Sequence, residues 1–340
     1  AGVDCRPREP VVVAEGGGIK AFGRAGDRTM ALGGLVDNKT AHAMRADMTG
    51  TSGATTIDGP AAFNSDTRVA SLALPDGRFL LAFGRDDQDR VVLALVDRDG
   101  STLDRTPLEV FNPTDGQSEP ALFLGPDGVA RLLWTSKIDD ATGRNVRLTR
   151  VDVTGNKIGP FGVPDVVHEA MAGDQHTSAG WYGTDSGMVA YVTEAPLGQI
   201  RVRKLDSNGH PTGAEVGIGN INVDVNRLSI AGVGDMRFVA WDDGAGTIHG
   251  RVINAAGTGL AQFSLADPKA LWSRPAFTSF ADTNLLLARR QTSSGEQLVQ
   301  FEIFPEGVVG PESILLDCAM STTSPTASNS DAFMSWFGLV

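Results

Sequence analysis

Short apolar runs recur along this chain, and each one follows a turn that contains an aspartate. Seven segments share this pattern: GDRTMALGG (26–34), PDGRFLLAFG (75–84), PDGVARLLWT (126–135), TDSGMVAYVT (184–193), GDMRFVAWDD (234–243), ADTNLLLARR (281–290) and SDAFMSWFG (330–338). They recur about every 50 residues. Almost wholly apolar runs of this length are typical of strands that are buried on both faces.

Each repeat holds further predicted strands around its apolar run. A short strand such as VASLAL (69–74) precedes the aspartate turn, and a polar loop of variable length follows the run. The next strand alternates apolar and polar residues, as in IRVRKLD (200–206), which is typical of a half-buried strand. That strand ends in a turn such as DRDG (97–100), and a weaker fourth strand follows. Each repeat therefore predicts four antiparallel strands.

Seven such repeats predict an all-β fold, a seven-bladed β-propeller of four-stranded antiparallel blades that forms one domain over residues 1–340. An open solenoid is the alternative, although its repeats are usually shorter. The expected repeats are 19–60, 66–112, 119–167, 177–222, 227–266, 274–316, and 323–340 completed by 1–15. In each run one position should hold a large residue that packs between blades, and these residues are Leu32, Phe83, Trp134, Tyr191, Trp241, Arg289 and Trp336.

The two ends of the chain are expected to close the ring. The last repeat supplies only two strands, and the strand VVVAE (11–15) precedes the first full repeat, so both ends would share one blade. The only cysteines, Cys5 and Cys318, precede these two segments. A Cys5–Cys318 disulfide would contribute on the order of 4 kcal/mol and would imply an oxidising compartment such as the periplasm, the cell surface or the medium. Two free buried thiols are the alternative.

The repeat resembles the degenerate repeats of secreted bacterial propeller proteins, on the pattern of Gly, an apolar run, Trp, a loop, and a strand that ends in Asp-x-x-Gly. The resemblance covers nearly the whole chain. It implies the fold and carries no catalytic residues, because the Asp box of sialidases, the Trp-Asp ending of WD40 blades, the kelch double Gly and the quinone-enzyme docking motif are absent from the sequence.

The turn DRDG raises the question of a calcium loop, because Asp97 and Asp99 alternate ahead of Gly100. Calcium needs six or more oxygen ligands. Across the repeats only Asp or Asn at the first turn position and Gly at the fourth recur, as in DVTG (152–155) and DSNG (206–209). We therefore predict structural hairpins in which Asp97 forms the turn and Asp99 is an exposed residue without a role.

Charge and composition exclude some partners. The formal net charge of −12 disfavours nucleic acid, and no apolar run reaches the roughly 18 residues of a membrane span. The phosphate-binding loops GxGxxG and GxxxxGK[ST] are missing from the sequence, and we expect no cofactor.

The loops on one rim of the ring are the expected ligand-binding face. These are the loops that enter each first strand and those that join second to third strands. A loop tryptophan, Trp272, with Arg274 beside it, would stack on a sugar or anchor a partner, or else make a packing contact. Arg289 would meet an anionic group in the channel, or else pair with an acid. The full set of predicted ligand-binding residues is Trp272, Arg274, Arg289, Asp242, Asp243, Glu194 and His176.

Catalytic and metal sites are less well supported. The loop 166–178 offers His168, Glu169, Asp174 and His176, but without the close spacing of zinc ligands, so we predict no metal. No GxSxG nucleophile motif occurs. Asp86, Glu194 and Asp242 from three repeats are the carboxylates on which a hydrolase would depend.

The function that these observations favour is a secreted or cell-surface, non-enzymatic binding or assembly module whose rim recognises a glycan or a protein. The alternatives are a carbohydrate-active hydrolase or lyase that uses rim carboxylates, and a subunit of a larger extracellular assembly with a neighbour at the closing blade.

Overall fold

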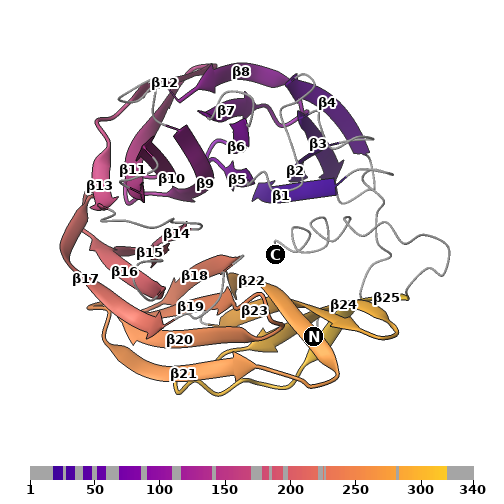
Figure 1. The fold of residues 1–340 in the computed structure, drawn as a ribbon. Coiled ribbons are helices and arrows are strands. Elements are labelled where there is room, and N and C mark those ends of the chain that lie inside the picture. Colours follow the sequence, from indigo (N-terminus) through magenta and orange to yellow (C-terminus); the bar gives the residue numbers. More distant parts are fainter. Residues whose placement is uncertain are drawn as a thin grey trace, which may run out of the picture.

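Strands make up the regular structure of the described residues (Figure 1). The computed structural model describes residues 18–25, 28–34, 41–47, 52–58, 69–85, 90–108, 116–139, 143–169, 178–183, 186–193, 198–220, 225, 227–280 and 283–319. Within these residues there is no helix that is both long and apolar enough to cross a membrane.

The described strands form six antiparallel sheets, here called blades 1–6 in chain order. Blades 1 and 2 consist of β1 (Gly18–Ala25), β2 (Arg28–Gly34), β3 (Ala41–Asp47) and β4 (Ser52–Asp58), and of β5 (Val69–Ala73), β6 (Phe79–Arg85), β7 (Arg90–Val96) and β8 (Thr102–Pro107). Blade 3 consists of β9 (Gly116–Leu124), β10 (Ala130–Asp139), β11 (Gly143–Thr154), β12 (Lys157–Phe161) and β13 (Asp165–His168).

The remaining blades follow the same order. Blade 4 consists of β14 (Ser178–Tyr182), β15 (Gly187–Thr193), β16 (Gln199–Leu205) and β17 (Pro211–Asn220). Blade 5 consists of β18 (Leu228–Val233), β19 (Met236–Asp242), β20 (Ile248–Asn254) and β21 (Gly259–Leu265). Blade 6 consists of β22 (Ala270–Phe280), β23 (Thr283–Thr292), β24 (Gly295–Glu302) and β25 (Ser313–Ala319).

The blades are arranged around a common centre, with the first strand of each blade innermost and the fourth outermost (Figure 1). The inner strands contact one another in chain order, from β1 to β5, β9, β14, β18 and β22. The fold is therefore a β-propeller, as the resemblance implied.

The prediction of seven four-stranded blades is wrong. The described residues contain five four-stranded sheets and a sixth sheet, blade 3, in which β12 and β13 both pair with β11. The seventh repeat was inferred from SDAFMSWFG (330–338), a single aspartate turn with one apolar run, completed by residues 1–15, and this pattern carries fewer strand signals than the four found in other repeats. Residues 1–15 and 323–340, which were expected to close the ring, lie outside the described residues, as does Cys5. The assignment of the whole chain to one domain stays a prediction.

The large residue of each apolar run packs against the preceding blade, as predicted for blades 2 to 5. Phe83 clusters with Ala43 and Ile57 of blade 1, and Trp134 clusters with the core of blade 2. Tyr191 and Trp241 pack in the same way against blades 3 and 4. These side chains are buried because the second strand is covered by a blade on each side, and every residue of β15 is buried.

Blade 6 departs from this pattern, because Arg289 does not occupy the position in the second strand that Trp241 occupies in blade 5. The hairpins align Met236 of blade 5 with Thr283 of blade 6, which puts Ala288 at the level of Trp241. Ala288 is buried in the cluster with blade 5. Because neighbouring residues of a strand point to opposite faces, Arg289 projects from the other face of blade 6.

The turns after the third strands are structural hairpins, as predicted. Gly100, Gly209 and Gly257 have φ of 92°, 81° and 83°, and each donates its N–H to the carbonyl of the first turn residue. The role of Asp99 was mispredicted, since its Oδ1 accepts a hydrogen bond from the Ser101 N–H at 2.8 Å. Asp97 accepts one from the Arg98 N–H at 2.7 Å.

Candidate ligand-binding cleft

A cleft of about 670 Å³ opens between blades 5 and 6. Three connections form it: the β19–β20 loop, the β21–β22 loop and the β23–β24 turn. These belong to the two classes of loop that were expected to carry the ligand-binding face. The cleft is lined by Ala245, Gly246, Thr247, Ala266, Asp267, Pro268, Lys269, Ala270, Leu271, Gln291, Thr292 and Ser293, and is here called the rim cleft.

Asp243 holds the β19–β20 wall of the rim cleft. Its Oδ1 accepts hydrogen bonds from the N–H groups of Ala245 and Thr247, each at 2.9 Å, and its Oδ2 lies 3.2 Å from Nε2 of His249. Burial alone would raise the pKa of Asp243, but the Thr247 N–H and the His249 side chain outweigh it, so that pKa lies below its usual value. The carboxylate therefore stays charged and fixes the loop.

Gly246 joins this loop to blade 6. Its carbonyl accepts a hydrogen bond from the Trp272 N–H at 2.8 Å, and its φ is 101°. A Cβ at Gly246 would lie 2.6 Å from Cδ2 of Leu271. A side chain at Gly246 would therefore clash with the rim as well as strain the backbone.

Leu271 gives the rim cleft an exposed apolar surface. Its exposed fraction is 55%, which is high for a large aliphatic side chain. Thr247, Gln291, Thr292 and Ser293 surround the same space with hydroxyl and amide groups. The Thr292 hydroxyl is held by the Ser294 hydroxyl at 2.8 Å and by the Gly295 carbonyl at 3.2 Å.

The structure brings three of the predicted site residues together beside the rim cleft. Arg274 donates its N–H to Oδ2 of Asp242 at 2.8 Å, which ties β22 to the end of β19. Arg274 has a φ of 57° and lies where the β22–β23 register shifts. A positive φ is uncommon outside glycine and marks a position that its surroundings hold in place. Asp243 follows directly in the loop.

Trp272 lies on β22 rather than in a loop, and its exposed fraction is 5%. The indole packs edge-on against Phe301 at 5.5 Å between ring centres, and the Arg290 guanidinium lies 5.3 Å from the ring centre. Trp272 supplies the bulk that Ala288 lacks between blades 5 and 6. Arg289, on the other face, pairs with Glu296, so the structure does not bring it together with Trp272.

The other predicted residues are placed elsewhere or lie outside the described part of the chain. Glu194, His176, Asp86 and Asp174 lie outside the described residues. Cys318 lies on β25. His249 and the lining residues of the rim cleft, Asp267 and Lys269 included, were not predicted, because no local motif marks any of them.

A second polar cluster fills the junction between blades 3 and 4. Both oxygens of Glu215 lie within 2.9 Å of Nδ1 of His168, and Arg201 donates to Oε2 at 3.3 Å. Arg203 donates to the carbonyls of Val166 and Val167 at 3.1 and 2.7 Å. Burial alone would raise the pKa of Glu215, but His168 and Arg201 outweigh it, and that pKa is lowered.

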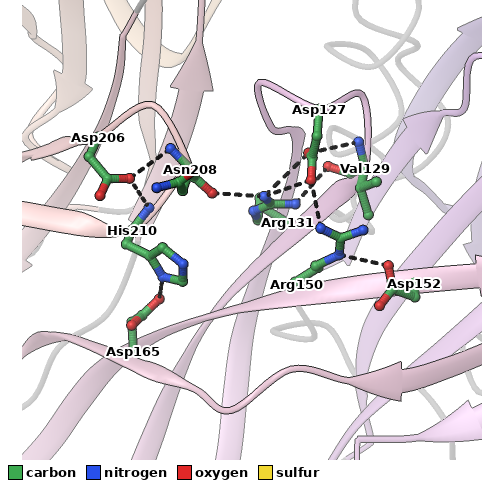
Figure 2. A network of polar contacts seen from close by, with 9 residues as sticks. All are labelled: Asp127, Val129, Arg131, Arg150, Asp152, Asp165, Asp206, Asn208 and His210. Atoms are coloured by element: carbon green, nitrogen blue, oxygen red, sulfur yellow. Dashed lines mark hydrogen bonds and ion pairs between the residues drawn. The ribbon is translucent and has the colours of Figure 1, made fainter.

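Figure 2 shows how the same junction is held along another part of blades 3 and 4. Arg131 donates to the Asn208 carbonyl at 3.0 Å, and Nδ1 of His210 lies 2.7 Å from Asp165. Asp127 in turn accepts from Arg150 at 2.8 Å. These side chains bind one another or the backbone, so the network joins blades and offers little to a ligand.

Comparison with known proteins supports the fold. No protein-family model and no curated protein sequence matches the chain. The polysaccharide lyase Uly1 has a TM-score of 0.55 and 11% identity over 95% of this chain and 86% of its own. Hydrazine synthase of Kuenenia stuttgartiensis has a TM-score of 0.54 and 12% identity over 89% and 80%. The lectin SapL1, in complex with α-methyl fucoside, has 14% identity over 88% and 96%, but its TM-score of 0.48 is too low to support an argument.

Proposed function

We propose that this protein is a non-enzymatic binding module that takes a glycan in the rim cleft. The observation that carries the proposal is the composition of the cleft, in which the exposed Leu271 is surrounded by hydroxyl and amide side chains. A sugar offers hydroxyl groups at its edge and C–H groups on its faces, and binding sites combine apolar surface with a few polar groups. The fold shared with a polysaccharide lyase is compatible with a saccharide ligand but does not decide it.

The carboxylates beside the cleft favour binding over hydrolysis. Asp243 holds two backbone N–H groups, Asp267 accepts the Lys269 N–H at 2.8 Å, and Asp242 is buried and accepts the Arg274 N–H. A glycosidase needs one carboxyl group to donate a proton and another to act as base or nucleophile, both facing the sugar. Acids that form turns and joints are poorly suited to these roles.

We further propose that the protein is secreted or exposed at a cell surface, with a disulfide between Cys5 and Cys318. The pairing is supported by the cysteine count, because the chain contains only these two cysteines. Mass spectrometry of a non-reduced digest is expected to give a peptide that links both cysteines. Two separate alkylated peptides would contradict the pairing.

The binding proposal is tested with a panel of immobilised oligosaccharides and with calorimetry on any that bind. Leu271→Asp places a charge on the apolar surface of the cleft and is expected to weaken binding by more than about tenfold. Leu260→Asp is the matched control, because Leu260 is exposed to 54% on β21 and is not part of the cleft.

Three outcomes would count against this proposal. Binding that survives Leu271→Asp would put the ligand elsewhere. A panel without any binding would favour a protein ligand instead. Release of new reducing ends from a bound oligosaccharide would favour the hydrolase alternative.

A further inference from the structure

The charged groups that line the rim cleft are few and of opposite sign. Lys269 and Asp267 come from the same β21–β22 loop, two positions apart in the chain. The other polar side chains of the lining, Thr247, Gln291, Thr292 and Ser293, are uncharged. A ligand in the cleft therefore meets hydroxyl and amide groups rather than a field of one sign.

Two consecutive arginines of β23 directly precede the cleft residue Gln291 in the chain, and both are already bound to acids of the same blade. Arg289 forms a two-point ion pair with Glu296, and Arg290 pairs with Glu312 at 2.8 Å while donating to Gln297 at 2.7 Å. Both guanidinium side chains are only 13% exposed. A ligand carboxylate would have to displace a protein carboxylate from a largely buried partner, and breaking such a pair leaves a charge without compensation.

Recognition of an acidic saccharide requires an arginine that is not already paired with an acid of the protein. A carboxylate or sulfate is bound most strongly by an arginine that offers two parallel N–H groups to it. The formal net charge of −12 adds long-range repulsion for any polyanion that approaches the surface. A neutral sugar loses nothing through either effect, because hydroxyl groups exchange hydrogen bonds with uncharged side chains.

We propose that the rim cleft selects neutral saccharides and discriminates against those that carry carboxylate or sulfate groups. This inference rests on the proposed function and names its ligand class. Selection arises because Glu312 occupies Arg290, the arginine that packs on Trp272, and because the lining is suited to hydroxyl groups.

The test compares matched saccharide pairs, each a neutral oligosaccharide and the same oligosaccharide with one sugar oxidised to its uronic acid. Calorimetry on the full chain is expected to give at least about tenfold tighter binding of the neutral member. Raising the salt concentration from 50 to 500 mM is expected to leave the affinity for the neutral member within about twofold, since no ion pair with the ligand is screened.

A gain-of-binding variant separates the role of the arginine pair from a general charge effect. Glu312→Gln releases Arg290 from its ion pair, leaving its hydrogen bond to Gln297, and is expected to raise the affinity for the acidic member by about threefold or more. Glu306→Gln removes the same charge at the turn that precedes β25, away from the cleft lining, and should not have this effect.

The outcomes distinguish this inference from the function on which it depends. Equal or tighter binding of the acidic members would overturn neutral selection and leave glycan binding intact. The absence of any gain in Glu312→Gln over Glu306→Gln would overturn the assigned role of Arg290. A failure of every saccharide to bind would overturn the proposed function itself, and neutral selection with it.

Discussion

The junction between blades 3 and 4 and the junction between blades 5 and 6 arise from the same repeat but are filled differently. At the first, Tyr191 of the second strand is the large residue, and His168, Glu215 and Arg203 bind across the blades. At the second, Trp272 of the first strand supplies the bulk while Ala288 occupies the position of the large residue. Its cross-blade hydrogen bonds run mainly through backbone N–H groups, as at Trp272 and Arg274.

The difference shows where a propeller of this kind keeps groups available for a ligand. The polar side chains between blades 3 and 4 bind one another and hold the two blades together. Those of β13 contact blade 4 near both ends of the strand, at Asp165 and at His168. Between blades 5 and 6, backbone N–H groups donate the hydrogen bonds at Trp272 and Arg274 that hold the blades together. Side chains such as Leu271 and Gln291 remain at the rim, where the cleft opens.

The largest effect is expected from Trp272→Ala, which removes the side chain that fills the blade 5–6 junction. Loss of a buried indole with incomplete collapse of the site should lower the free energy of unfolding by about 3–5 kcal/mol. Urea unfolding followed by circular dichroism measures it. A loss below about 1 kcal/mol would mean that neighbouring side chains, and not Trp272, hold this junction together.

Glu215→Gln is expected to have the next largest effect, because it leaves His168 and Arg201 without their acid. The free energy of unfolding should fall by about 1–2 kcal/mol at pH 7, a value reduced for partial exposure of the carboxylate. The folded pKa of Glu215 is lowered, so its stabilisation is present above the usual pKa of 4.5 and is lost as the pH falls through the folded value.

The pH series provides the check on this pair. The stability advantage of the wild type over Glu215→Gln should shrink between about pH 5 and pH 3. Glu306→Gln, at an exposed turn, should give nearly equal stability at both pH values. An advantage that grew on acidification would contradict the role given to the Glu215 carboxylate.

The contrast between the junctions also explains what the sequence allowed us to predict. Aspartate and glycine mark the turns, and apolar runs mark the second strands, since both follow from local chemistry. The position of Arg289 was misjudged by one residue, because the large residue was counted from the aspartate without regard to the hairpin register. Trp272 was misplaced in a loop because β22 starts earlier than its sequence suggested.

Contacts between residues far apart in the sequence could not be predicted from the pattern of apolar runs and turns. His168 meets Glu215 across 47 positions of sequence, and nothing local to either residue signals the other. The rim cleft likewise combines mostly uncharged residues from three separate connections. Only the loop classes that form it were predictable, because they follow from the order of strands in a blade.

A smaller effect on stability is expected from substitutions of Asp243, whose turn has counterparts after the third strands of blades 4 and 5. Asp206 and Asn254 each accept hydrogen bonds from the N–H groups two and four positions later, as Asp243 does. Asp243→Asn should therefore preserve the loop, whereas Asp243→Ala should lower the free energy of unfolding by about 1 kcal/mol.

Hydrogen exchange locates the Asp243 effect. The amides of Ala245 and Thr247 should exchange faster in Asp243→Ala and stay protected in Asp243→Asn. Asn254→Ala is the matched control, with faster exchange at Ala256 and Thr258 and no change in the cleft. Equal loss of protection in both Asp243 variants would mean that charge pairing with His249, rather than the two N–H contacts, holds the loop.

The smallest effect is expected from Tyr191→Phe at the blade 3–4 junction. Tyr191 is fully buried, and in the described part of the chain its hydroxyl has no hydrogen-bond partner. Burial, reinforced by the nearby Glu215 carboxylate, raises the pKa of Tyr191, so the hydroxyl stays neutral. Removing an unpaired buried hydroxyl should leave the free energy of unfolding within about 1 kcal/mol or increase it slightly. A larger loss in urea unfolding would mean that the hydroxyl donates to Glu215, and that the polar network of this junction extends into the residue that fills it.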